Sequence, residues 1–196
     1  GSAAVIAAMR AVAALRLPVT VTALVPTAEN LLSGSAYRPG DVVRHHDGTT
    51  TEVDNTDAEG RMVLADALAY AQTRWRPDLI VDVATLTGAM KVSLGLRTGG
   101  LFSDDDDLAR RLTEAGAAWG EAWWRMPLIE DLDPDLDGVI ADVNQGCGRG
   151  AGGIRAALFL RRFIRDVPWA HLDIAGPGRA EKPYQEVAEG ATGFAA

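Results

Sequence analysis

The sequence of 196 residues has little of what several common kinds of site require. Its single cysteine, Cys147, excludes an internal disulfide and any zinc site built from several cysteines. No apolar run approaches the ~20 residues of a membrane helix, and no basic residues precede the apolar start, so we expect neither a membrane span nor a secretory signal. A reducing, cytoplasmic setting is therefore the expectation.

Positive charge and histidine are also scarce. The 19 lysines and arginines are outnumbered by 27 aspartates and glutamates, which gives a formal net charge of −8 at pH 7. Because nucleic acids and anionic membranes attract basic surfaces, this charge argues against both as main partners. The three histidines, His45, His46 and His171, lack the i, i+4 spacing of a helical zinc site, so we interpret them as surface or structural residues.

Helical and strand patterns alternate along the chain, which predicts one α/β domain with a mixed, mostly parallel central sheet flanked by helices. Neither an internal repeat nor a linker is visible, and the length suffices for one well-packed core. We predict helices at the start of the chain, from residue 61 to Pro77, at 88–96, after the aspartates 104–107, and at 154–164. We predict strands at 19–26, 41–44, 50–53, 79–86, 98–103, 138–143 and 169–176.

The segment DNTDAEGR (54–61) precedes the apolar run MVLADALAYA. Thr56 followed three residues later by Glu59 fits a capping box, and Asp57 and Glu59 suit the positive end of a helix dipole. If the segment is extended instead, Asp57, Glu59 and Arg61 alternate onto one side, where the two carboxylates could ligate one or two divalent cations. The dipole disfavours Arg61 in a first turn, so we interpret it as an anion clamp beside a metal site.

A glycine run offers a different chemistry. Gly148, Gly150 and Gly153 have the spacing of a dinucleotide-binding loop, and Asp173 follows twenty residues later, where an acid could bind a ribose. Such a loop usually occupies the first βα turn of its domain, whereas only one further strand follows here. A plain glycine-rich turn is the simpler interpretation. Cys147 has no base near it in sequence, which gives little support to a nucleophile.

Acidic stretches give two weaker alternatives. The start of a calcium loop is matched by Asp133, Asp135, Asp137, Gly138 and Ile140. Its twelfth position is Asn144 where a bidentate glutamate is required, and Pro134 interrupts the flanking helix, so we predict a solvated acidic loop instead. We interpret the aspartates 104–107 as the charged first turn of a helix rather than as a cation site.

Several blocks resemble the leucyl (cytosol) aminopeptidase family of two-metal exopeptidases. The heptad NTDAEGR (55–61) is similar to its signature, and DVATLTGA (82–89) to the strand and turn that follow. The other matching blocks, in order, are PTAEN (26–30) with SG (33–34), RPGD (38–41), GG (152–153) with AALFL (156–160), HLDIAG (171–176) and GATG (190–193). The resemblance therefore covers essentially the whole chain.

The resemblance implies removal of N-terminal residues, leucine and other apolar ones, from peptides. It implies two divalent ions (Mn²⁺ or Zn²⁺, possibly Mg²⁺) bound by Asp57 and Glu59, with Glu59 bridging both, and a bicarbonate held by Arg61 as general base. It implies a homo-oligomer, a hexamer in the family, and a glycine run that packs a helix against the sheet. The substrate-binding residues that it implies are Thr85, Leu86 and Gly88.

In the family, two blocks upstream of the heptad supply two lysines and two aspartates to the same site, and this sequence contains neither block. We therefore expect residues 1–196 to form part of a C-terminal catalytic domain, without the N-terminal regulatory domain, and to carry half of the site. We expect weak metal binding and no peptidase activity from these residues alone. The alternative functions are a dinucleotide-binding module and a non-catalytic subunit that packs in an oligomer.

Overall fold

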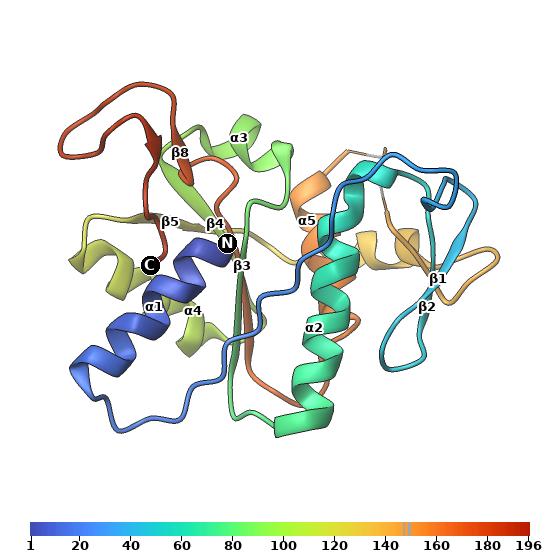
Figure 1. Ribbon diagram of the computed structural model, residues 1–196, viewed down its shortest axis with the longest axis horizontal. Coiled ribbons are helices and arrows are strands. Elements are labelled where there is room, and N and C mark those ends of the chain that lie inside the picture. Colours follow the sequence, from blue (N-terminus) through green and yellow to red (C-terminus); the bar gives the residue numbers. More distant parts are fainter. Residues whose placement is uncertain (147, 149) are drawn as a thin grey trace. The chain divides into compact units, whose positions relative to one another are not determined.

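The computed structural model describes residues 1–146, 148 and 150–196 (Figure 1). Contacts divide the chain into two compact units. The chain passes from one unit to the other four times, so neither unit is a continuous stretch of sequence. Unit 1 comprises Gly1–Val25, Leu79–Pro127 and Pro168–Ala196, and unit 2 comprises Pro26–Asp78 and Leu128–Val167.

A four-stranded sheet with the order β3-β7-β4-β5 forms the centre of unit 1. β3 is parallel to β7 and β4 is parallel to β5, while β4 and β7 are antiparallel, so the predicted mixed, mostly parallel sheet is confirmed. A separate two-stranded ribbon follows it. The strands of unit 1 are β3 (Ile80–Ala84), β4 (Thr98–Phe102), β5 (Ala122–Arg125), β7 (Trp169–Asp173), β8 (Arg179–Ala180) and β9 (Gly190–Ala191).

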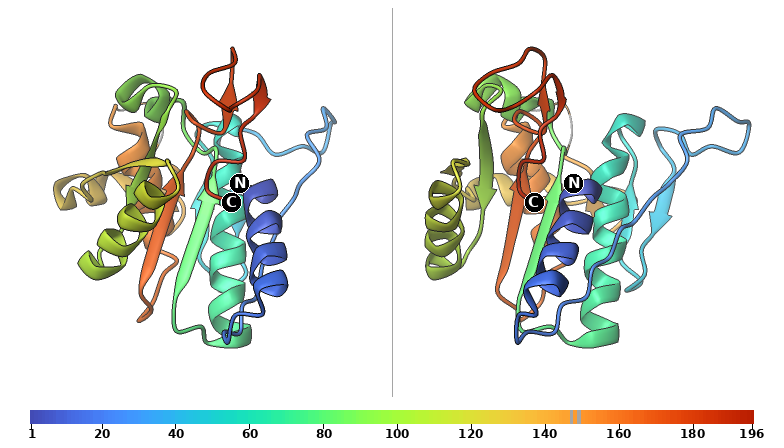
Figure 2. Two further views of the ribbon diagram at one scale, coloured as in Figure 1. Left: turned by 90° about the vertical axis from the view of Figure 1, so that its left-hand side faces the viewer. Right: turned by 60° about the vertical axis from the view of Figure 1, so that its left-hand side comes forward.

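Three helices belong to unit 1: α1 (Ser2–Leu15), α3 (Gly88–Leu94) and α4 (Asp106–Ala118). α1 runs alongside β3 (Figure 2), and α4 packs against β5 and β7, where Leu101, Ala109 and Leu172 form a buried cluster. The Asp105 side chain accepts a hydrogen bond from the backbone N–H of Leu108 at 2.9 Å and so caps α4. The aspartate run is therefore a helix start, as predicted.

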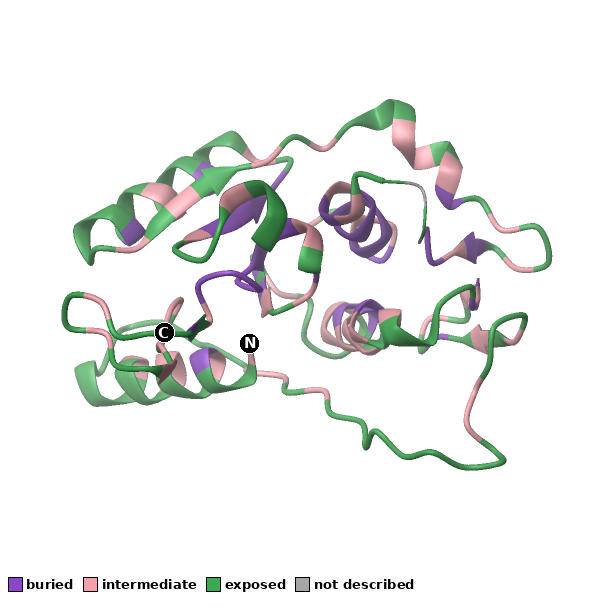
Figure 3. Ribbon diagram, turned by 90° about the horizontal axis from the view of Figure 1, so that it is seen from above, coloured by how far each residue is buried: buried purple, intermediate pink, exposed green. Residues whose placement is uncertain are grey.

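Unit 2 is built on two helices that pack against each other, α2 (Glu59–Trp75) and α5 (Gly152–Arg161). α5 is buried along nearly its whole length (Figure 3), whereas α2 buries one stripe that includes Met62, Ala65 and Leu68. A small sheet has the order β1-β2-β6, in which the predicted β1-β2 hairpin is confirmed. The remaining elements are β1 (Val42–Arg44), β2 (Thr50–Glu52), β6 (Val143–Asn144), and the 3-10 helices η1 (Thr56–Ala58) and η2 (Glu130–Leu136).

The strand predicted over residues 19–26 is wrong, because residues 20–33 form neither helix nor strand. Val19 and Val21 are exposed. Their β-branched side chains favour a strand, but a strand also needs a neighbour for its backbone hydrogen bonds, and no strand among the described residues pairs with this segment. β6 is shorter than predicted, and β5 was not predicted. Of the helices that the structure describes, none combines the length and apolarity needed to cross a bilayer.

His45 is a buried ionisable group in unit 2. Its Nδ1 lies 3.2 Å from Oδ1 of Asp66 and its Nε2 lies 2.9 Å from Oγ1 of Thr51, while the ring meets Phe163 edge-on at 4.7 Å between centroids. Burial lowers the pKa of His45 below its ordinary value, and the charges of Asp66 and Asp47 oppose this only in part. The folded protein therefore favours the neutral imidazole.

This predicts a loss of stability on acidification. Since the unfolded chain keeps the higher pKa, it binds more protons as the pH falls through about 6.5, and the free energy of unfolding decreases there. We expect urea unfolding between pH 7.5 and 5 to show this decrease in the wild type and a smaller one in His45→Gln. The exposed neighbour provides the control, since His46→Gln should keep the full pH dependence; equal slopes in all three proteins would contradict the prediction.

Candidate functional site

The segment Asn55–Arg61 enters α2 through the single 3-10 turn η1. The side-chain oxygen of Asn55 accepts a hydrogen bond from the backbone N–H of Asp57 at 2.9 Å, so Asn55 is the cap. The capping box expected from Thr56 and Glu59 is not formed. The extended alternative is also wrong, because η1 and α2 follow each other without a break. Asn55 itself is extended, which lets its short side chain reach the N–H two residues later.

Asp57 and Glu59 are both exposed, and neither carboxylate makes a hydrogen bond or ion pair with any described residue. Tyr37 lies near them, because its hydroxyl donates to the backbone carbonyl oxygen of Thr56 at 2.9 Å. Burial raises the pKa of Tyr37, and the charges of Glu59 and Asp57 raise it further. The carboxylates therefore lie beside a neutral phenol that is already engaged, and their oxygens are open to a cation from solvent.

The side chain of Gln145 binds the backbone just before α2 begins. Its Oε1 accepts hydrogen bonds from the backbone N–H groups of Asp54 and Asn55, both at 2.9 Å, and its Nε2 donates to the carbonyl oxygen of Ala58 at 3.4 Å. Its own carbonyl oxygen accepts a hydrogen bond from Nη1 of Arg61 at 2.5 Å. Both Gln145 and Arg61 are buried. No local pattern marks Gln145, because its partners lie 84 to 91 residues away in sequence.

The turn after β3 carries the second group of predicted residues. Thr85 and Gly88 are exposed and Leu86 is half-buried, with Gly88 as the first residue of α3. Asp173, at the end of β7 and fully buried, accepts hydrogen bonds from the backbone N–H groups of Leu86 at 3.1 Å and Thr87 at 3.0 Å. A Cβ atom built on Gly88 would meet no atom within 4 Å, so the protein itself leaves this position open.

The predicted site residues therefore fall into two groups, one in each unit. In unit 2, Asp57, Glu59 and Arg61 lie close together in sequence, in η1 and the start of α2. In unit 1, Thr85, Leu86 and Gly88 lie between β3 and the start of α3. Within the described part of the chain, no three or more histidine, cysteine, aspartate or glutamate side chains are grouped so that they could hold a metal ion. Asp57 and Glu59 thus supply carboxylate donors but not a complete coordination shell.

Each of the three histidines has a partner within the described part of the chain. His171 is fully buried on β7, with its Nδ1 2.6 Å from Oδ1 of Asp82, and Nε1 of Trp169 donates to the other oxygen of Asp82 at 2.8 Å. His45 lies in the buried cluster described above. The exposed His46 contacts Tyr70 edge-on at 5.1 Å between centroids. The interpretation of the histidines as surface or structural residues is confirmed.

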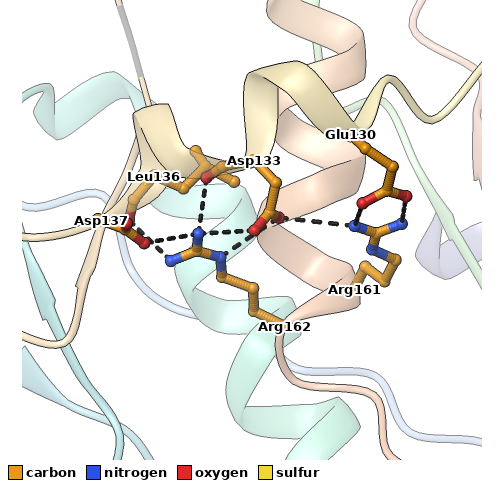
Figure 4. A network of polar contacts seen from close by, with 6 residues as sticks. All are labelled: Glu130, Asp133, Leu136, Asp137, Arg161 and Arg162. Atoms are coloured by element: carbon orange, nitrogen blue, oxygen red, sulfur yellow. Dashed lines mark hydrogen bonds and ion pairs between the residues drawn. The ribbon is translucent and has the colours of Figure 1, made fainter.

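The acidic loop is held by arginines of α5 and the residue that follows it. Nη2 of Arg162 lies 2.8 Å from carboxylate oxygens of both Asp133 and Asp137 (Figure 4), and Asp135 is bonded to Arg155. Burial alone would lower the pKa of Arg162, but the bonds to Asp133 and Asp137 outweigh it and raise the pKa. The predicted acidic loop is the 3-10 helix η2 in its first part, and its carboxylates neutralise arginines while Asp137 stays exposed to solvent.

The glycine run precedes α5 without a side-chain cap. Gly148 and Gly150 have φ of +82° and +78°, which suits glycine, and Cys147 lies outside the described residues. Asp173, the residue expected to bind a ribose, belongs to unit 1 and has each carboxylate oxygen engaged by N–H groups. The geometry favours a plain glycine-rich turn.

The contacts of Gln145 predict that its side chain stabilises unit 2. Gln145→Met keeps the length of the side chain but removes the acceptor of two backbone N–H groups and the donor to Ala58, and we expect a loss of about 1–3 kcal/mol in the free energy of unfolding. Chemical denaturation measures it. Gln185→Met, at an exposed position, is the matched control; equal stabilities of the two variants would contradict the role of Gln145.

Comparison with known proteins gives a consistent result over the whole chain. The family model described as "Cytosol aminopeptidase family, catalytic domain" matches residues 1–196. The chain is 53% identical over 194 residues to a probable cytosol aminopeptidase of Roseiflexus castenholzii, covering 98% of this chain and 40% of that protein. It is 51% identical to the corresponding protein of Chlorobium limicola, covering 99% and 38%. The chain thus spans about 40% of the length of these curated relatives.

Solved structures agree in fold. The bottromycin maturation enzyme BotP matches with a TM-score of 0.95 and 51% identity over 100% of this chain and 44% of that one, and a second structure of BotP is a complex with Mn. A mutant of tomato leucine aminopeptidase matches with a TM-score of 0.78 and 45% identity over 85% of this chain and 32% of that one. The resemblance found in the heptad and the later blocks is confirmed: the chain belongs to the cytosol aminopeptidase family and lies within its catalytic domain.

Proposed function

We propose that this chain is part of a metal-dependent aminopeptidase that removes N-terminal residues, leucine and other apolar ones, from peptides. The observation that carries the proposal is the state of the acidic residues in unit 2. The carboxylates of Asp133 and Asp135 are bonded to arginines. Those of Asp57 and Glu59 are exposed, have no hydrogen-bond or ion-pair partner among the described residues, and belong to a segment that Gln145 fixes. Family membership supports the same assignment.

In this proposal the carboxylates of Asp57 and Glu59 would hold the metal ions, and Glu59 is the ligand that the family resemblance assigns to both. Carboxylate oxygens suit hard and borderline divalent cations, so Mn²⁺, Zn²⁺ and Mg²⁺ are all compatible with the donors present. The name of the BotP complex records Mn in a protein that is 50% identical to this chain. The remaining ligands in the proposal are the lysine and aspartates of the two upstream blocks that the family resemblance implies.

When bound, such a pair of ions activates water and polarises the scissile carbonyl group. The chain's own residues hold the reacting groups. Arg61, fixed by its bond to the carbonyl oxygen of Gln145, supplies a positive charge one turn after Asp57, and in the proposal it would hold a bicarbonate, which would supply a general base. Thr85, Leu86 and Gly88 bind the substrate residue through a turn whose outer side is open.

The partners in the proposal are peptide substrates and further copies of the same protein, with a hexamer taken from the family resemblance. The cytoplasm is the proposed location, on the strength of the single cysteine and of the relatives' name, cytosol aminopeptidase.

The first prediction concerns metal binding by the 196 residues. With only two carboxylates contributed, we expect weak binding of Mn²⁺, followed by the electron paramagnetic resonance signal of the free ion, and its loss in Asp57→Ala and in Glu59→Ala. Glu186→Ala, at an exposed position in unit 1, is the matched control and should bind as the wild type does. Binding that survives both substitutions would overturn the assignment of these ligands.

The second prediction concerns activity. These 196 residues alone should not hydrolyse a leucine anilide in the presence of Mn²⁺ or Zn²⁺, because two ligands do not complete a two-metal site. Robust turnover would contradict the proposal that this chain carries half of the site.

The third prediction uses the open space at Gly88, in an enzyme in which the two upstream blocks precede this chain. Because a Cβ at this position contacts nothing in the protein, Gly88→Ala should leave the melting temperature unchanged. If the substrate lies against Gly88, the added methyl group raises KM by about tenfold or more. Unchanged kinetics would remove Gly88 from the substrate-binding residues.

The dinucleotide-binding alternative has a separate test. Since both oxygens of Asp173 accept hydrogen bonds within the protein, we expect no saturable binding of NAD to the 196 residues by calorimetry. Saturable binding that is lost in Gly150→Ala would favour the alternative over the peptidase.

A further inference from the structure

We propose that Asp173 is a positioning residue that fixes the conformation of the substrate-binding turn Thr85–Gly88. This inference rests on the proposed function, because it assumes that the turn contacts the substrate. Asp173 is far from the turn in sequence, touches neither metal nor substrate, and acts only through the backbone of the turn.

The hydrogen bonds of Asp173 use the full capacity of its carboxylate. Oδ1 accepts from the backbone N–H groups of Leu86 at 3.1 Å and Ala175 at 3.0 Å. Oδ2 accepts from the backbone N–H of Thr87 at 3.0 Å and from its hydroxyl at 2.8 Å. An ionised carboxylate accepts about four hydrogen bonds and donates none, so the number and kind of these partners match the group. Asp173 is fully buried, which removes water as a competitor for the same donors.

The sheet sets the place of this carboxylate. β3 and β7 are parallel, with Ala84 opposite Asp173, and the backbone N–H of Ile174 donates to the carbonyl oxygen of Ala84 at 2.8 Å. The two strands therefore end side by side, and the chain leaving β3 passes directly over the carboxylate. β7 pairs with β3 on one side and with β4 on the other, so the sheet holds Asp173 in place without the turn.

The bonds to Asp173 decide which groups the turn presents outward. None of the described peptide bonds is cis. In a trans peptide the carbonyl group points opposite to the N–H group of the same unit. Since the N–H groups of Leu86 and Thr87 point to the carboxylate, the carbonyl oxygens of Thr85 and Leu86 point away from it. The outer side of the turn thus offers hydrogen-bond acceptors in a fixed orientation, and Asp173 is what fixes them.

The variant that tests this is Asp173→Asn, which keeps the shape of the side chain. The NH₂ group replaces one of the two acceptor oxygens. On the Oδ1 side the bonds to the N–H groups of Leu86 and Ala175 are lost; on the Oδ2 side the bond to the N–H of Thr87 is lost, while its hydroxyl can turn to accept. Asp82→Asn is the matched control: Asp82 is also a buried carboxylate, lies on the neighbouring strand, and binds His171 and Trp169 rather than the turn. Thr87→Val is a milder variant that removes only the hydroxyl bond and keeps the backbone N–H.

The first readout is amide hydrogen exchange of the 196-residue chain, which needs neither metal nor activity. We expect the amides of Leu86 and Thr87 to exchange about tenfold faster or more in Asp173→Asn than in the wild type, and to exchange as in the wild type in Asp82→Asn. Wild-type exchange at both amides in Asp173→Asn would overturn the proposal. If Asp173→Asn does not fold, Thr87→Val removes one of the four bonds to Asp173 and should speed exchange at the amide of Thr87 by a smaller factor; wild-type exchange there would then overturn the proposal.

The second readout is the division between KM and kcat in the enzyme that contains the upstream blocks, at a temperature where the variants are fully folded. If Asp173 orients the substrate-binding turn, Asp173→Asn should raise KM by about tenfold and change kcat much less, because the metal ligands lie on another segment. Asp82→Asn should keep the wild-type KM. If a general loss of sheet stability caused the higher KM, Asp82→Asn would raise KM as well. Equal changes of KM in Asp173→Asn and Asp82→Asn would overturn the proposal.

Different results would overturn substrate binding by the turn and the role of Asp173. If Gly88→Ala leaves KM unchanged, the turn does not bind substrate, and the positioning role falls together with the proposed function. If Gly88→Ala raises KM while Asp173→Asn changes neither KM nor the exchange of the two amides, only the role of Asp173 is overturned.

Discussion

The parallel pairing of β3 with β7 is the constraint on which the rest of unit 1 depends. Its register sets Asp82 beside His171 and Ala84 beside Asp173. Both carboxylates are buried, and this register brings each of them donors from the neighbouring strand or turn. A shift by one residue would turn every side chain of β7 to the opposite face and separate both buried carboxylates from these donors, at a cost of several kcal/mol. Because all five residues of β7 are buried, no solvent could compensate for that loss.

The same arrangement recurs in unit 2 with an amide in place of a carboxylate. Gln145 lies fully buried against the turn that precedes α2 and binds its backbone, so that Asp57 and Glu59 need no bonds of their own to hold their place. A carboxylate that is fixed by an arginine, as Asp133 is, has its charge neutralised. Fixing the backbone instead leaves the charge on the surface.

Features with a local cause could be predicted from the sequence, and features with a distant cause could not. Apolar periodicity locates the main helices, and the continuous apolar run at residues 79–86 locates β3, because both patterns reflect burial of the chain. The strand expected at Val19 fails because a strand depends on a neighbour, and the cap expected at Thr56 fails because Asn55 competes for the same turn. The heptad contains the exposed candidate ligands Asp57 and Glu59. The contacts of Gln145 with the turn before α2 and of Asp173 with Leu86 join residues 84 to 91 positions apart, so no local pattern predicts them.

The position of β7 in the middle of its sheet has a consequence for biosynthesis. β7 joins β3 to β4, yet it is the last of the four strands in the chain. During synthesis from the N-terminal end, β3 therefore meets the partner strand described here only when residues 169–173 have left the ribosome, and until then the turn after β3 lacks the carboxylate beneath it. The same late strand thus completes this pairing and supplies the group that holds the turn.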